Sequence, residues 1–89
     1  MSLSLATTKV AQYTAALESL AGQVAIAEGA HIKAVTDKDD GAVKESVAHL
    51  QRLKTLMGMY KDFIEFWKDI IKTVLGLLKM FTELAQGSR

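Results

Sequence analysis

Apolar side chains recur at alternating steps of three and four residues along the second half of the chain, from Val43 to Ala85. This alternation has a mean period of about 3.5 residues, the spacing of a helix face that packs along a second helix. No Pro occurs in the chain to interrupt helical hydrogen bonding. The pattern therefore predicts one long helix. Its seam consists of Val43, Ser46, Leu50, Leu53, Met57, Tyr60, Ile64, Trp67, Ile71, Val74, Leu78, Phe81 and Ala85.

A second apolar series lies beside this seam and repeats every seven residues. It consists of Leu56, Phe63, Ile70, Leu77 and Leu84, and a third, partial series adds Met59, Phe66 and Met80. A surface helix of a globular protein shows one apolar stripe of about 100°. This helix is apolar over more than half of its circumference, so we expect two or more neighbouring helices to cover it.

The first third of the chain shows the same alternation. Its seam consists of Ala6, Val10, Tyr13, Leu17, Leu20, Val24, Ala27, His31 and Ala34. The flanks of this seam are rich in Ala, which favours helix and allows a neighbouring helix to approach closely. Together the two periodic segments predict an all-α fold, a long antiparallel helical hairpin with helices at about 4–35 and 41–86.

The two helices are joined by a predicted loop at residues 36–40, which has no large apolar side chain. We expect Asp39 or Asp40 to cap the second helix by accepting a backbone N–H, with Gly41 in the same turn.

The whole chain, residues 1–89, is long enough for a single domain. The terminal residues 1–3 and 87–89 are expected to be disordered or to derive from an expression vector.

The two predicted helices differ in length: at a rise of about 1.5 Å per residue, the first is about 48 Å long and the second about 70 Å. When the chain folds back at the loop, the start of the first helix lies opposite roughly residue 73 of the second. The overhanging end carries large apolar side chains, which a folded protein does not leave in water. We therefore expect assembly into a four-helix bundle or a larger helical oligomer. These overhanging side chains are Val74, Leu75, Leu77, Leu78, Met80, Phe81 and Leu84.

An alternative is a break of the second helix near Gly58, which would give three shorter helices, or a bend at Gly76. The residues around Gly58 are Leu and Met, and they lack the polar groups that usually form helix connections. A continuous second helix is therefore the favoured prediction.

Few side chains are suited to chemistry. His31 and His49 are the only imidazoles, and a hairpin could bring them near each other, but neither lies in a metal-binding spacing. The loop and its aspartates are too short a segment for an EF-hand calcium loop, which needs twelve residues with ligands at fixed positions. No phosphate-binding or nucleophile motif occurs, and Cys is absent. We therefore expect no enzyme activity, no catalytic residue, no metal ligand and no cofactor.

The charges nearly cancel, with 11 Lys and Arg against 10 Asp and Glu, so we expect no nucleic-acid partner. The N-terminus lacks the basic and apolar regions of a Sec signal. The most apolar window, residues 63–81, still contains several charges, so no transmembrane helix is predicted. Either a cytoplasmic location or export by a route other than Sec is compatible with these features.

The predicted function is self-association, or adaptor binding to a helical protein, through the wide apolar face of the second helix. The residues predicted to form this interface are Leu56, Met57, Tyr60, Phe63, Ile64, Trp67, Ile70, Ile71, Val74, Leu77, Leu78, Phe81 and Leu84. Trp67 is the expected anchor, because large aromatic side chains dominate the energetics of interfaces.

Two alternatives stay open. The small, Cys-free hairpin is similar in layout to the needle and inner-rod subunits of type III secretion systems, which implies an exported subunit that polymerises. Needle subunits carry a Pro-containing turn, whereas this chain has no Pro. The second alternative is a membrane-active protein whose amphipathic second helix contacts lipid, although its polar face lacks the excess of Lys and Arg typical of such helices.

Overall fold

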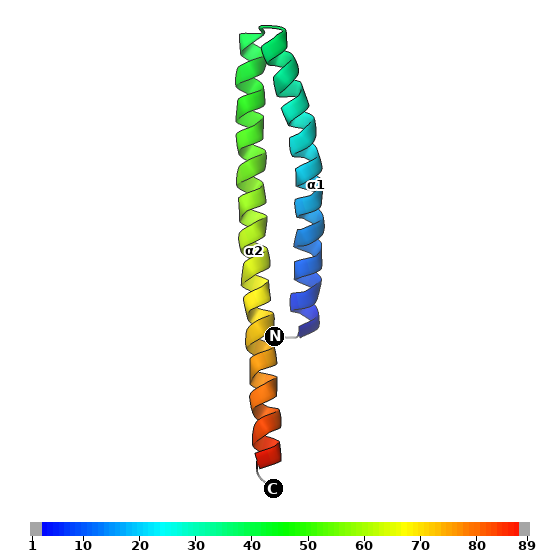
Figure 1. Ribbon diagram of the computed structural model, residues 1–89, viewed down its shortest axis with the longest axis vertical. Coiled ribbons are helices and arrows are strands. Elements are labelled where there is room, and N and C mark those ends of the chain that lie inside the picture. The colour runs from blue at the N-terminus through cyan, green and yellow to red at the C-terminus, as the bar shows by residue number, and fades with distance from the viewer. Residues whose placement is uncertain (1–2, 88–89) are drawn as a thin grey trace.

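Two long antiparallel helices make up the fold, as the computed structural model shows for residues 3–87 (Figure 1). α1 spans Leu3–Thr36 and α2 spans Asp40–Gly87. The predicted all-α helical hairpin is confirmed, with helix ends within one residue of the predicted positions. α2 runs without interruption through Gly58 and Gly76, so the alternative with a broken second helix is wrong.

The corner between the helices is short because both helix ends are closed by hydrogen bonds. The N–H of Lys38 donates to the carbonyl of Val35 at 3.1 Å, and the N–H of Asp39 donates to the carbonyl of Ala34 at 3.1 Å. This pair of bonds is a Schellman motif, which satisfies the last carbonyls of α1. Lys38 occupies the left-handed position of that motif with φ 56°. Gly is the usual residue there, because a Cβ atom strains this conformation.

Asp39 then begins the second helix. Its Oδ1 accepts a hydrogen bond from the N–H of Ala42 at 3.1 Å, and its carbonyl accepts one from the N–H of Val43 at 2.9 Å. The capping residue is therefore Asp39, whereas Asp40 is the first residue of the helix and supplies an acidic side chain to its first turn. That charge is favourable at the positive end of the helix dipole. Asp39 thus takes part in both helix ends: its N–H donates to the last turn of α1, and its side chain and carbonyl accept from the first turn of α2.

The two seams predicted from the sequence face each other. Every seam residue of α1 is buried or half-buried, as is every seam residue of α2 from Val43 to Val74. The centre of the core is formed by Leu20, Ala27 and Leu53, against which Met57 and other seam side chains pack. Among residues 3–87, no large side chain is fully buried. A two-helix hairpin is too thin to surround its own core.

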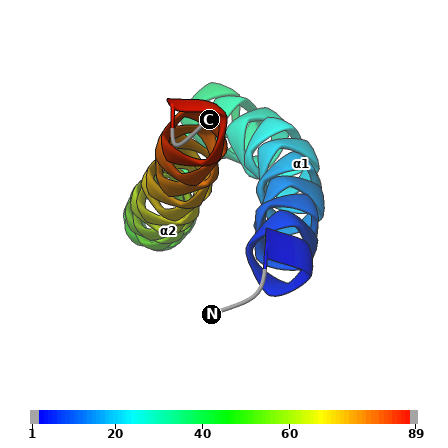
Figure 2. The same ribbon diagram turned by 90° about the horizontal axis from the view of Figure 1, so that it is seen from below.

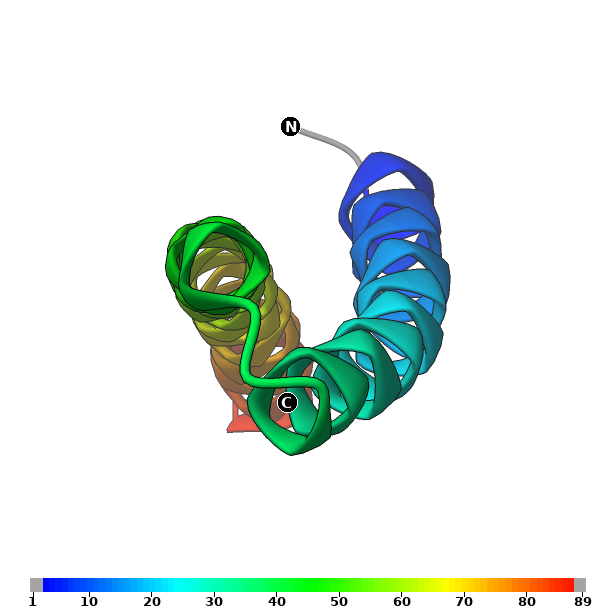
Figure 3. The same cartoon turned by 90° about the horizontal axis from the view of Figure 1, so that it is seen from above.

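α2 is much the longer helix, with 48 residues against 34 in α1. Its C-terminal part extends well beyond the start of α1 (Figure 1). We call residues 75–87 the tail; all of them are exposed. The end views show α1 swept around α2 along its length rather than lying straight beside it (Figure 2 and Figure 3). This curvature fits a seam with a period below 3.6 residues.

The structure describes two of the six terminal residues that were predicted to be disordered or to derive from an expression vector. Leu3 and Gly87, which we expected to lie outside the ordered domain, are the first residue of α1 and the last of α2. The other terminal positions of that prediction, 1–2 and 88–89, lie outside the described residues.

Candidate interaction surface

The predicted interface residues divide into three groups in the structure. One group belongs to the seam between α1 and α2 and is buried or half-buried within the hairpin itself. This group consists of Met57, Tyr60, Ile64, Trp67, Ile71 and Val74. Trp67, the expected anchor, therefore faces α1, and only part of its side chain is accessible to a partner.

Aromatic side chains join the seam to the outside of α2. Tyr13 of α1 lies with its ring 5.7 Å from that of Tyr60 and 5.4 Å from that of Phe63. On the next turns, Phe66 packs edge-to-face on Trp67 with ring centroids 5.5 Å apart. Aromatic pairs of this geometry stabilise beyond the area that they bury. They hold Phe63 and Phe66 in place on the outer side of α2.

The second group forms a continuous apolar row on this outer side. Its members follow one another at alternating steps of three and four, with Thr73 as the one polar position of the series. We call these residues the outer row: Leu56, Met59, Phe63, Phe66, Ile70, Leu77, Met80 and Leu84. Ile70 is half-buried, and the other members are 41–65% exposed. Met59, Phe66 and Met80 were missing from the predicted interface, although their spacing relative to Leu56 completes a second heptad pattern.

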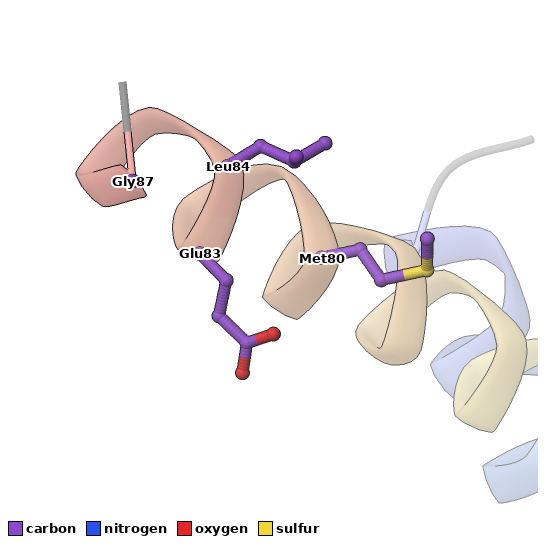
Figure 4. A pocket seen from close by; sticks show the side chains of 4 residues that line it. All are labelled: Met80, Glu83, Leu84 and Gly87. Atoms are coloured by element: carbon purple, nitrogen blue, oxygen red, sulfur yellow. The ribbon is translucent and has the colours of Figure 1, made fainter. Parts of the chain in front are cut away.

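In the tail, the seam itself is also exposed because no part of α1 lies beside it. Leu78 is 53% exposed and Phe81 is 65% exposed. The end of the tail has a shallow hollow bounded by Met80, Glu83, Leu84 and Gly87 (Figure 4). All four residues come from one helix, so the hollow is open to solvent. Met80 and Leu84 project on one side, whereas Glu83 points away from them (Figure 4).

The molecule as a whole exposes far more surface than a compact protein of its mass. Its accessible surface is 6677 Å², whereas about 5,100 Å² is typical for a folded monomer of 9.7 kDa. Its radius of gyration is 21.2 Å, against about 12 Å for a compact domain of the same length. The excess surface of roughly 1,500 Å² is larger than the ~800 Å² that one partner contributes to a standard interface.

The two histidines have different surroundings. His31 Nδ1 lies 2.8 Å from Ser46 Oγ, which itself donates to the carbonyl of Val43. The Ser46 hydroxyl thus lies between His31 of α1 and the backbone of the first turn of α2. His49 is exposed and lines an open hollow with Glu45 and Arg52. Within residues 3–87, no cluster of three or more His, Asp or Glu side chains is suitable for holding a metal ion.

The described part of the chain also contains no helix that combines the length and the apolar character needed to cross a membrane. Comparison with known proteins found no matching family model, no matching curated protein and no matching solved structure. The outer row and the tail are thus the features from which a function can be argued.

Proposed function

We propose that this chain is a non-catalytic helical module that associates with other copies of itself, or with a helical partner, through the outer row of α2. The observation that supports this proposal is the continuity of the exposed row from Leu56 to Leu84 along one side of α2. A row spaced at steps of three and four is the pattern by which one helix packs along another.

The energy available from covering the row is large. Burying the exposed part of each member gains roughly 1–2 kcal/mol, so the whole row offers on the order of 10 kcal/mol before the entropy of association is subtracted. The row is also uncharged, so a partner helix would not trap an unpaired charge. Acidic side chains at Asp62, Asp69 and Glu83 lie just outside it. They are placed to remain at the solvated rim of an interface.

Light scattering coupled to size exclusion tests this proposal with two single substitutions on α2. Phe66→Glu adds a negative charge within the outer row at a side chain that is 56% exposed, so the hairpin core stays intact. Gln51→Glu adds the same charge at an exposed position on the N-terminal side of the row. We expect the wild type and Gln51→Glu to have at least twice the mass of the chain at micromolar concentration. Phe66→Glu is expected to have a smaller mass than Gln51→Glu without losing helical circular dichroism.

A wild type that stays monomeric with no partner present would contradict self-association through the row. Equal masses for Phe66→Glu and Gln51→Glu would place the contact elsewhere on the molecule.

A second candidate function is that of an exported subunit that polymerises. The observation that favours it is the presence of two separate uncovered apolar surfaces, the outer row beside α1 and the seam of the tail. Two such surfaces on one chain permit open-ended assembly as well as closed oligomers. Concentration-dependent fibres in negative-stain electron microscopy would support polymerisation, whereas one fixed oligomeric mass at all concentrations would refute it. Membrane activity stays a prediction, which co-sedimentation with anionic and neutral vesicles tests.

A further inference from the structure

The tail continues the helix face that α1 covers over the rest of α2. Val74, the last covered seam residue, is half-buried, and Leu78 and Phe81 continue the same spacing into solvent. We propose that the tail of a second copy of this chain covers them, in antiparallel orientation. Each copy's tail then continues the line of the other copy's α1. This inference rests on the proposed self-association and specifies one of its contacts.

The side of the tail that carries Leu78 and Phe81 is uncharged, as the packing face of a partner helix requires. Between Thr73 and Gly87 the only charged residues are Lys79 and Glu83. At about 100° per residue, both lie on the half of the helix opposite Leu78 and Phe81. Leu75 and Leu77 flank the seam and are 49% and 48% exposed. Apart from Thr82, a second helix on this face therefore meets apolar side chains and no charge.

The orientation follows from the position of α1. A second α2 that ran parallel to the first on this face would have to extend back along the seam into the space that α1 occupies. In the antiparallel orientation, the rest of the second copy extends away past Gly87, where no helix of the first copy lies (Figure 1). Only the antiparallel orientation lets both hairpins keep their α1 in place.

The lengths also match. The uncovered part of α2 is the tail. Because the two chains are identical, the tail of one copy is long enough to cover the whole tail of the other. A two-fold axis through the tails therefore covers both tails at once and leaves neither seam open. With the seams facing each other, Leu78 of one copy lies between Phe81 and Ala85 of the other along the helix, and the C-terminal end of each α2 approaches the start of the other copy's α1.

This arrangement is a long rod rather than a compact bundle. Two α2 helices that overlap by the tail alone span roughly 120 Å, against 77 Å for one hairpin. The outer rows remain exposed along this rod from Leu56 to Phe66. The contact is therefore separable from the one proposed for the outer row.

A distance measurement between spin labels tests the arrangement in the full chain. The sequence has no Cys, so Lys61→Cys provides a single labelling site at an exposed position on α2. In the tail-to-tail dimer, the two labels lie about 60 Å apart, because each is about 20 residues from the axis at the middle of the tail, at about 1.5 Å per residue. We call this separation the tail-to-tail distance. In a bundle whose α2 helices overlap along their length, the labels approach to about 30 Å or less, which we call the bundle distance.

Two substitutions in the labelled chain show which contact produces the measured separation. Leu78→Glu places a charge on the exposed seam of the tail and is expected to abolish the tail-to-tail distance. Gln51→Glu adds the same charge at an exposed position far from the tail and is expected to leave that distance unchanged.

The outcomes separate this inference from the proposed function. An oligomer whose labels show only the bundle distance, or whose tail-to-tail distance survives Leu78→Glu, overturns the tail contact and leaves self-association through the outer row standing. A tail-to-tail distance that persists in Phe66→Glu confirms the tail contact and shows that it does not need the outer row. A monomeric wild type overturns both the tail contact and self-association through the outer row.

Discussion

Replacing Lys38 by Gly should make the hairpin more stable, although it removes a charged side chain from the surface. Lys38 holds a left-handed conformation with φ 56° at the corner between the helices. For an L-residue this conformation costs about 1–2 kcal/mol, and Gly adopts it without that cost. Gly loses more chain entropy on folding, by about 0.5–1 kcal/mol, so we expect a net stabilisation of about 0.5–1 kcal/mol. For a chain of this size, that gain raises Tm by about 2–8 °C.

The matched control is Lys33→Gly, which makes the same chemical change one turn earlier. Lys33 lies in the last turn of α1 in ordinary helical conformation, and its carbonyl accepts a hydrogen bond from Asp37. Gly within a helix costs about 1 kcal/mol, so this variant should be less stable than the wild type. Both variants are compared by urea and thermal unfolding followed by circular dichroism at one fixed protein concentration. If both substitutions destabilise to the same extent, Lys38 is not in the left-handed position and our description of the corner is wrong.

Two further substitutions test the core and the continuity of α2. Leu53→Ala should lower the free energy of unfolding by about 2–4 kcal/mol, because Leu53 is only 4% exposed and packs against Leu20 and Ala27 at the centre of the core. A loss below about 1 kcal/mol in urea unfolding would contradict that packing. Gly58→Ala should raise stability by about 0.5–1 kcal/mol, because a Cβ at Gly58 would meet no atom within 4 Å and the position lies inside a continuous helix. A destabilised Gly58→Ala would show that the chain needs Gly at this point.

The hairpin could be predicted from the sequence because its seam is a local periodic signal. The alternation from Ala6 to Ala34 and from Val43 to Val74 matches the faces that the structure buries between α1 and α2. The turn chemistry around Asp39 likewise fixed the position of the corner. The role of Lys38 was not predictable, because Lys has no preference for the left-handed conformation that the hydrogen bonds of the corner impose on it.

The division of the apolar face of α2 was harder to predict. Sequence spacing shows that this face is too wide for one neighbour, but it does not show which part of it the chain's own α1 covers. Trp67 and Phe66 are adjacent in sequence, yet the first faces α1 and the second lies on the outer row. The register between α1 and α2 decides which of the two side chains α1 covers. That register depends on the tight corner and on pairs such as Tyr13 with Tyr60.

The unequal lengths of α1 and α2 also affect how the C-terminal turns hold together in solution. Helices of about 12–15 residues are marginal in water without packing, and Gly76 weakens the helix near the base of the tail. The amide hydrogens of these turns are therefore protected from exchange mainly by what lies against them, while those beside α1 are protected by the hairpin itself. Dilution should speed exchange in the C-terminal turns and leave the rest of α2 unchanged, which makes the length of the ordered helix depend on protein concentration.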